Sequence, residues 1–230
     1  MAEEQQRRRI RSFVRREGRM TTSQKRALEE LWGAYGIDVD DTLLDLNTVF
    51  PAIAPTILEI GFGNGNSLLT MAQNSPHNNY LGVEVHRPGV GNLLQNLERQ
   101  AVGNVRIICH DAVEVVENNL APQSLHGVHL FFPDPWPKRK HHKRRLLQPG
   151  FASRLATRLK PGAQFHIATD WQDYARHMME VMSESGDFIN TFAEGAYAPR
   201  PDDRPLTRFE QRGQRLGHEV WDLVFTKKPA

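Results

Sequence analysis

Apolar positions along the chain follow two alternating spacings. Short continuous apolar runs, typical of buried strands, alternate with segments in which apolar residues recur every three or four positions, which indicates helices. The expected strands cover residues 57–60, 80–85, 105–109, 128–132 and 165–168. The expected helices between and after them are marked by residues 68–72, 93–101, 113–120, 151–159 and 174–182. This alternation predicts an α/β protein with a single Rossmann-like, doubly wound, mainly parallel sheet and helices on both faces.

The segments outside this alternation complete the predicted domain. A first helix is expected from Ser23, as its cap, to Gly36, and two late strands at 188–192 and 220–225. Residues 195–215 are rich in proline and charge, so they predict a long functional loop. At 230 residues and 39% apolar content, the chain is long enough for one well-buried domain. We expect a basic N-terminal arm at residues 1–20 and one domain at 21–230.

Carboxylates lie at the ends of five predicted strands. They are Glu59, Glu84, Asp111, Asp134 and Asp170. One such acid commonly caps the next helix, but five on one rim repel one another unless a ligand uses them. Ligands of open α/β sheets bind at the carboxyl ends of the strands. The rim therefore predicts a binding site.

A glycine-rich turn after the first strand points to the ligand. Gly61, Gly63 and Gly65 are spaced G-x-G-x-G, which differs from the G-x-G-x-x-G turn that holds a dinucleotide pyrophosphate. Glu84 can accept hydrogen bonds from both ribose hydroxyls, and Asp111 is placed for the exocyclic amine of adenine. A nucleoside without phosphate contacts fits these residues, so we expect S-adenosylmethionine rather than NAD.

The sequence Asp134-Pro135-Trp136 is the candidate for the reacting side. The flanking prolines restrict the backbone and hold Asp134 at the strand end. Trp136 offers a face on which a base can stack. A rigid turn with a buried tryptophan is the alternative interpretation.

Positive charge is concentrated in two short segments. Residues 1–20 contain seven arginines and three glutamates, and residues 138–145 contain six cations and no acid. The net charge of the whole chain is only +2, so the remainder is net negative. Cations gathered in this way are typical of a surface for polyanions, although a solvated tail and loop would have the same composition.

Other classes of site have little support. One cysteine, Cys109, excludes an internal disulfide, and the ten histidines show no metal-ligand spacing, so we expect no metal. No stretch resembles a signal peptide or could span a bilayer, which predicts a cytoplasmic protein without membrane contact.

These motifs together resemble the bacterial tRNA (guanine-N7)-methyltransferases, which use S-adenosylmethionine and have the class I methyltransferase fold. The resemblance extends from Arg9 nearly to the C-terminus and is carried by long, specific motifs. They are Arg9 to Arg16, Leu58 to Gly63, Gly82 to His86, Cys109 to Ala112, Phe131 to Trp136, Ala168 to Trp171, and Thr207 to Gly213.

The resemblance implies a role for each motif. It implies a catalytic Asp134 and a guanosine of the tRNA variable loop as the target. The implied cofactor contacts are Glu59, Gly61, Gly63, Glu84, Asp111 and Asp134. The implied substrate contacts are Lys138, Asp170, Thr207, Arg208, Phe209 and Glu210. The implied RNA contacts are Lys140, His141, His142, Lys143, Arg144 and Arg145, and we expect segments 7–16 and 138–145 to grip the tRNA backbone of a monomeric enzyme.

Three alternatives remain open from the residues themselves. A methyltransferase acting on a small molecule or protein would keep the cofactor residues but leave the basic run unexplained. A non-catalytic RNA-binding module would not bind S-adenosylmethionine. An NAD oxidoreductase is disfavoured by the glycine spacing.

Overall fold

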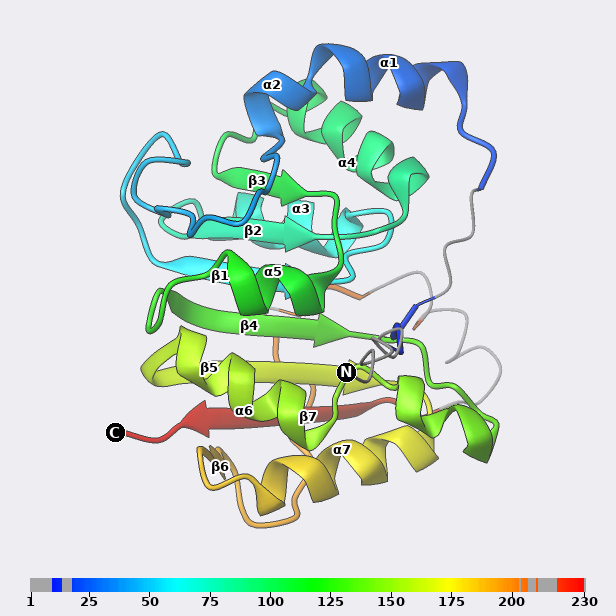
Figure 1. Ribbon diagram of the computed structural model, residues 1–230, viewed down its shortest axis with the longest axis vertical. Helices are drawn as coiled ribbons and strands as arrows, with labels where there is room; N and C mark the ends of the chain where they lie inside the picture. Colours follow the sequence, from blue (N-terminus) through cyan, green and yellow to red (C-terminus); the bar gives the residue numbers. More distant parts are fainter. Residues whose placement is uncertain (1–9, 14–17, 203, 207–209, 211–218, 230) are drawn as a thin grey trace, which may run out of the picture.

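A seven-stranded sheet forms the centre of the molecule (Figure 1). The structure is a computed structural model, and it describes residues 10–13, 18–202, 204–206, 210 and 219–229. The strands are β1 (Thr56–Ile60), β2 (Asn79–Val83), β3 (Val105–Ile108), β4 (Leu125–Phe131), β5 (Leu159–Thr169), β6 (Phe188–Asn190) and β7 (Trp221–Lys227). Their order is β3-β2-β1-β4-β5-β7-β6. Strands β1 to β5 pair in parallel, and β7 is antiparallel to both neighbours. The predicted mainly parallel sheet is confirmed.

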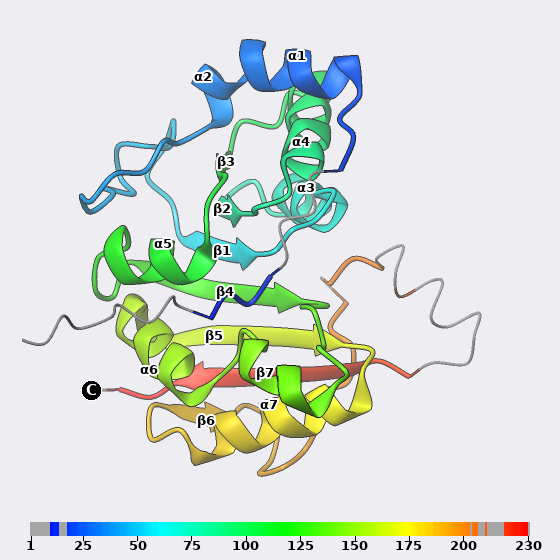
Figure 2. The ribbon, with the colours of Figure 1, turned by 45° about the vertical axis from the view of Figure 1, so that its right-hand side comes forward.

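Helices cover both faces of this sheet (Figure 2). They are α1 (Thr22–Glu30), α2 (Trp32–Tyr35), α3 (Asn66–Asn74), α4 (Arg87–Arg99), α5 (Ala112–Asn118), α6 (Pro149–Arg158), α7 (Gln172–Glu184) and the 3-10 helix η1 (Arg139–Arg144). Helices α5, α6 and α7 pack into one core, while α1, α3 and α4 pack into a second core on the opposite face. The structure is therefore doubly wound, as predicted.

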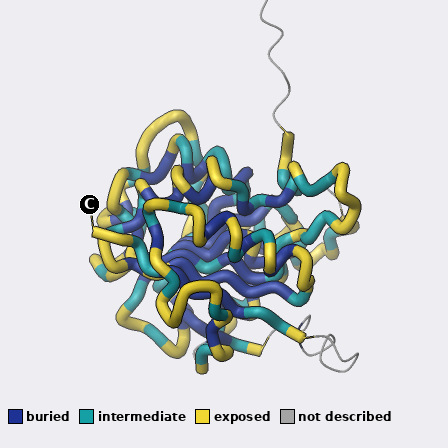
Figure 3. Tube along the Cα trace, turned by 90° about the horizontal axis from the view of Figure 1, so that it is seen from below, coloured by how far each residue is buried: buried dark blue, intermediate teal, exposed yellow. Residues whose placement is uncertain are grey.

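The alternation of side chains along the strands explains the two cores. In β1, Leu58 and Ile60 belong to the core with α5 to α7, whereas Ile57 packs against the other. In β3, Val105 and Ile107 face one core and Ile108 the other. Successive side chains of a strand point to opposite faces, so strands covered on both faces are apolar throughout. Figure 3 shows these buried strands enclosed by exposed helix surfaces and loops.

Three local details differ from the sequence prediction. Thr21, not Ser23, caps α1, because its side chain accepts from the Gln24 amide while the Gln24 side chain accepts from the Thr21 amide. Strand β5 begins at Leu159, well before the predicted residue 165, and a register irregularity lies opposite residues 125–127 of β4. The basic run forms the short helix η1.

In the described part of the chain, no helix is long and apolar enough to cross a membrane.

Candidate active site

A cavity of about 1240 Å³ opens at the carboxyl ends of β1 to β4. Its wall contains predicted residues from four separate segments of the sequence. They are Gly61, Glu84, Asp111, Asp134, Lys138 and His141. The parallel direction of the four strands brings these ends to one edge, as expected for an open α/β sheet. The sheet therefore assembles the predicted cofactor side and reacting side into one cavity.

The glycine turn between β1 and α3 has a backbone that other residues adopt only with strain. Gly61, Gly63 and Gly65 have φ angles of 73°, 57° and 77°. A Cβ on Gly65 would also lie 2.7 Å from the Leu93 side chain of α4. The glycines thus allow the turn to pass tightly between the sheet and α4.

Glu84 is held in place by backbone amides. Its Oε1 accepts hydrogen bonds from the amides of Val85 (2.7 Å) and His86 (2.9 Å), and its Oε2 accepts from Gly63 (2.8 Å). The carboxylate joins the glycine turn to the end of β2 and lines the cavity. Asp111, which follows β3, lines the cavity too and caps α5 by accepting from the Val113 amide at 3.0 Å.

Glu59 lies beneath this rim rather than on the cavity wall. It is 2% exposed, and its Oε2 has no hydrogen-bond partner. Burial, and secondarily the nearby Glu84 carboxylate, raise the pKa of Glu59 to about 8. This environment therefore favours the neutral form of the Glu59 carboxyl.

The segment after β4 has a strained backbone, which hydrogen bonds from β5 and from Arg145 hold in place. Phe132 and Trp136, each followed by proline, have φ angles of 52° and 47°, and such conformations cost about 1–3 kcal/mol each unless the surroundings enforce them. The Phe132 amide donates to the Ala168 carbonyl of β5 at 2.7 Å, and the Arg145 Nε donates to the Pro135 carbonyl at 3.0 Å. Asp134, in the middle, is exposed at the cavity wall.

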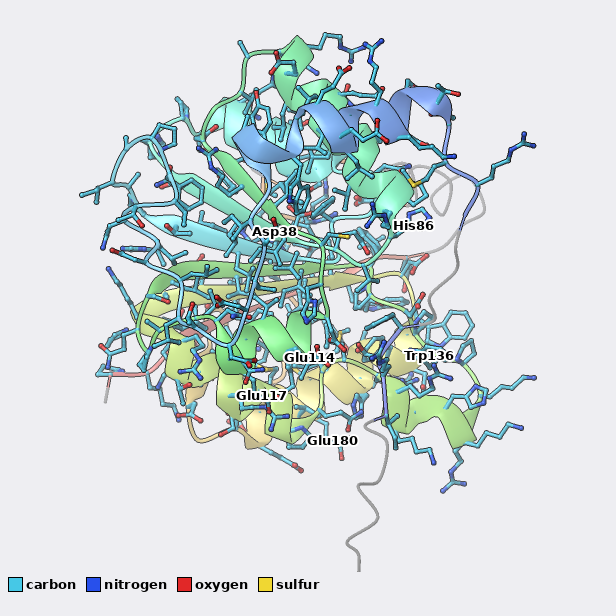
Figure 4. The ribbon with its side chains drawn as sticks, turned by 45° about the horizontal axis from the view of Figure 1, so that its top comes forward. Asp38, His86, Glu114, Glu117, Trp136 and Glu180 are labelled. Carbon is cyan, nitrogen blue, oxygen red and sulfur yellow. The ribbon has the colours of Figure 1, made fainter. Side chains whose placement is uncertain are left out.

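Trp136 contacts the N-terminal segment, which the sequence did not predict. Its Nε1 donates to the Ser12 carbonyl at 2.9 Å, and the Arg144 guanidinium lies over the indole ring at 4.0 Å. Arg144 also donates to the carbonyl of Phe13 at 3.3 Å. One face of the predicted stacking platform is thus covered by Arg144 in this structure. Figure 4 shows Trp136 and His86 along the same edge of the molecule.

The N-terminal segment forms part of the cavity itself. Ser12, Phe13, Gly18 and Met20 line it. The signal in the sequence was the presence of Phe13 and Met20 within an otherwise basic arm. Residues 1–9 and 14–17 of the arm lie outside the described residues.

The basic run divides into surface cations and one buried arginine. Lys138, Lys140 and Lys143 are exposed. Arg145, in contrast, is 3% exposed, and its guanidinium pairs with Asp173 and lies over the Tyr174 ring at 4.8 Å. In this structure its guanidinium is withdrawn from the surface and supports the loop, so the expected contact of Arg145 with RNA stays a prediction.

Of the remaining substrate-side residues that the structure describes, Asp170 and Glu210 do not line the cavity. Asp170 is half-buried directly after β5, and Glu210 is 1% exposed with both carboxylate oxygens bound to Arg204. Thr207, Arg208 and Phe209 lie outside the described residues. The structure thus brings Asp134 and Lys138 into the same cavity as Glu84 and Asp111, whereas Asp170 and Glu210 do not line it.

Comparison with known proteins identifies the family to which the chain belongs. The sequence model of a family described as putative methyltransferase matches residues 53–223. The tRNA (guanine-N(7)-)-methyltransferase of Hydrogenovibrio crunogenus is 57% identical over 96% of this chain and 92% of its own length. The enzyme of that name from Aeromonas hydrophila is 56% identical over 96% and 93%. The chain belongs to the tRNA (guanine-N7)-methyltransferase family.

A solved structure supports the fold independently. The 16S rRNA methyltransferase KamB has a TM-score of 0.54 and 16% identity to this chain, over 94% of this chain and 97% of its own. At this identity the likeness concerns the fold, which is that of the class I methyltransferases. Membership of the family makes this chain a methyltransferase, so its cavity is a candidate active site.

Proposed function

We propose that the chain transfers a methyl group from S-adenosylmethionine to N7 of a guanosine in the variable loop of tRNA. The observation that carries the proposal is the shared cavity: Asp134 and Lys138 stand on the same wall as Glu84 and Asp111, beside the cations of η1. The identity of 56–57% with two enzymes named tRNA (guanine-N(7)-)-methyltransferase supports the substrate. With tRNA as the substrate, we expect a monomer acting in the cytoplasm.

The hydrogen-bond acceptors of the cavity fit S-adenosylmethionine. This cofactor presents an ammonium group, ribose hydroxyls and an adenine amine, all of which donate hydrogen bonds to carboxylates. Glu84 and Asp111 line the cavity, and buried Glu59 beneath it has an oxygen without a partner. We assign Glu59, Gly61, Gly63, Glu84, Asp111 and Asp134 to this cofactor, which supplies an electrophilic methyl group when bound.

Asp134 is proposed to orient the guanine and stabilise positive charge. N7 of guanine carries an in-plane lone pair and no proton, so the reaction needs no strong general base. Methylation places positive charge on the ring, and a carboxylate fixed nearby stabilises that charge. The strained backbone around Asp134 supports this role, because positioning of the reacting groups contributes much of the acceleration.

The other substrate contacts are assigned by the same reasoning. Guanine N1–H and its exocyclic amine are donors, and Asp170 and Glu210 are the proposed acceptors. Lys138, Thr207, Arg208 and Phe209 are the further proposed substrate contacts. Glu210 is already bound to Arg204, so a contact with guanine would share an oxygen between the two partners.

The tRNA backbone is proposed to lie along η1 and the N-terminal arm. Lys140, Lys143, His141 and His142, with the cations of 7–16, would contact phosphates in a salt-dependent manner. Arg144 already joins the two segments, since it donates to the carbonyls of Arg11 and Phe13 at 3.3 Å.

The test is methyl transfer from labelled S-adenosylmethionine to unmodified tRNA, followed by identification of the modified nucleoside. We expect N7-methylguanosine. The same single-turnover assay with Asp134→Ala, at saturating cofactor and tRNA, should give a rate at least ~10²-fold lower, the scale typical of a lost group that stabilises developing charge. A rate near that of the wild type would contradict the role of Asp134.

Two controls separate the alternatives. Ribonuclease treatment of the acceptor should abolish methyl transfer, and persistent transfer to a small molecule or protein would contradict an RNA substrate. Calorimetry should detect binding of S-adenosylmethionine but not of NAD, and absence of the former would favour a non-catalytic RNA-binding module.

A further inference from the structure

A cluster of buried charges lies behind the wall that carries Asp134. Arg204, Glu210 and Asp222 are each at most 2% exposed, and none of them lines the cavity. Asp222 belongs to β7 and pairs with Ala168 of β5, whereas Arg204 belongs to the segment that follows β6. The cluster therefore joins that segment to the carboxyl end of β5.

The Arg204 guanidinium bridges the two carboxylates. Its Nη1 and Nη2 donate to the two Glu210 oxygens at 2.6 and 2.8 Å. Its Nη2 also donates to Asp222 Oδ2 at 3.0 Å, and its Nε lies 2.8 Å from Asp222 Oδ1. Asp222 Oδ1 is in turn 2.7 Å from Nε2 of His166 on β5. These bonds leave the planar guanidinium with one orientation.

Stability alone does not account for such a cluster. Removing an arginine and a carboxylate from water costs several kcal/mol per ion, and apolar residues of similar volume often stabilise a core as well or better. Burying the pair does, however, impose a single geometry on the groups around it. The question is which group near the site this geometry holds.

Phe132 is the group in contact with both the cluster and the cavity. The Arg204 guanidinium lies over its ring at 5.7 Å, while Phe132 itself lines the cavity. Its left-handed backbone (φ 52°) persists only if its surroundings enforce it. Pro133 and Asp134 follow Phe132 directly, so the position of Phe132 determines the position of the Asp134 backbone.

We propose that Arg204, held by Glu210 and Asp222, is a positioning residue that fixes Phe132 and through it the Asp134 carboxylate. The inference rests on the proposed methyl transfer, in which Asp134 touches the base. Arg204 itself does not line the cavity or contact the reacting atoms. Its loss should therefore slow the transfer step while leaving the cofactor side, built from Glu84 and Asp111, intact.

The test compares Arg204→Lys and Asp222→Asn with the wild type. Lysine keeps the charge but cannot bridge two carboxylates with a planar fork. Asp222→Asn removes the negative charge that pairs with Arg204 and keeps nearly the same side-chain volume. We expect single-turnover transfer to saturating tRNA to fall at least ~10-fold in each variant, because a displacement of ~1 Å at a reacting group can cost ~10²-fold. The affinity for S-adenosylmethionine should stay within ~3-fold of wild type. This is less than the tenfold change that ~1.4 kcal/mol of binding free energy would produce.

Arg158→Lys is the matched control for a merely structural effect. Arg158 is a partly buried arginine that donates to the Val116 and Glu117 carbonyls, at the amino end of β5 and away from the cavity. We expect this variant to lose thermal stability but to transfer methyl at a rate within ~2-fold of wild type, since distant sites act independently.

Each outcome is decisive. Wild-type rates in both Arg204→Lys and Asp222→Asn, or an equal loss of rate in Arg158→Lys, would overturn the positioning role. A loss of cofactor affinity that matches the loss of rate would also overturn it. If Arg204→Lys fails to fold, Asp222→Asn decides alone. An inactive wild type would refute the proposed function itself, which is a different result from an active wild type with unaffected variants.

Discussion

Glu59 illustrates how burial changes the ionisation of a carboxyl group. Its side chain is enclosed, and one of its oxygens has no hydrogen-bond partner. Burial and the Glu84 carboxylate both disfavour ionisation, which raises the pKa of Glu59 from 4.5 to about 8. The folded protein then holds this proton more tightly than the unfolded chain. Stability should therefore fall as the pH rises from about 4.5 to about 8 and level off above that range.

Glu59→Gln should remove this dependence. Glutamine has nearly the same shape but cannot ionise, so the variant should melt ~2–4 °C or more above the wild type at pH 8–9, the shift expected for ~1 kcal/mol in a chain of this size. At pH 5 the two proteins should melt together. Calorimetric melting of ligand-free protein between pH 5 and 9 measures the difference. Glu29→Gln, at an exposed position of α1, should show no such trend, and a flat difference for Glu59→Gln would contradict the buried-acid account.

The acids of the rim were identifiable from the sequence, but their separate environments were not. Spacing placed Glu59, Glu84 and Asp111 at successive strand ends, and the structure has them there. These environments depend on other segments of the chain. The Gly63 amide donates a hydrogen bond to Glu84, and the packed core excludes solvent from Glu59. Arg145 shows the same limit, because its charge suggested RNA and only its burial against Tyr174 and Asp173 indicates a supporting role.

At the scale of elements, helix α4 and the glycine turn depend on each other. A Cβ on Gly89, in the first turn of α4, would lie 2.0 Å from the Gly63 carbonyl oxygen. The Gly63 amide is bound to Glu84, so any movement of the turn is transmitted to a carboxylate of the cavity. Two glycines, 26 positions apart in the sequence, thus allow the helix and the turn to come close enough to shape this part of the cavity.

Gly89→Ala should therefore weaken cofactor binding. The added methyl group must displace the Gly63 turn, and overpacking of this kind costs ~1–3 kcal/mol. If about 1.4 kcal/mol of that falls on the bound state, the affinity for S-adenosylmethionine should drop ~10-fold in a calorimetric titration. Gly103→Ala is the matched control, since a Cβ there meets nothing within 4 Å. Equal affinities for the two variants would disprove the coupling between α4 and the turn.

At the scale of the whole molecule, exposed cations gather beside the cavity. Lys140 and Lys143 of η1 are exposed, and Arg144 of the same helix contacts segment 11–13. A surface of this kind attracts polyanions over distances near the Debye length, ~10 Å at 0.1 M salt. The cavity and these cations thus lie on adjoining surfaces.

Replacing Lys140 and Lys143 together by alanine should weaken tRNA binding without affecting the cofactor. If each contacts one phosphate, the slope of log affinity against log salt should decrease by ~1.4–1.8 in magnitude. Filter binding of tRNA at several salt concentrations measures the slope, and calorimetry with S-adenosylmethionine provides the second readout. The double variant Arg99→Ala with Lys228→Ala removes two exposed cations at the opposite edge of the sheet and should leave the slope unchanged. An unaltered slope in the η1 variant would exclude these lysines from the interface.

The sequence by itself determined the α/β class, the order of the elements and the residues at the strand ends, because each of these follows from local spacing of apolar, glycine and acidic positions. Only the tertiary structure decided which charges are buried and which are free. Arg204 and Arg145 look like surface cations in the sequence, yet long-range packing encloses both and uses them to hold the strained segment around Asp134. The sequence likewise predicted an open stacking face on Trp136, whereas in the structure its indole N–H is bound to the Ser12 carbonyl. Burial depends on the sum of contacts from distant segments, and no local pattern contains that sum.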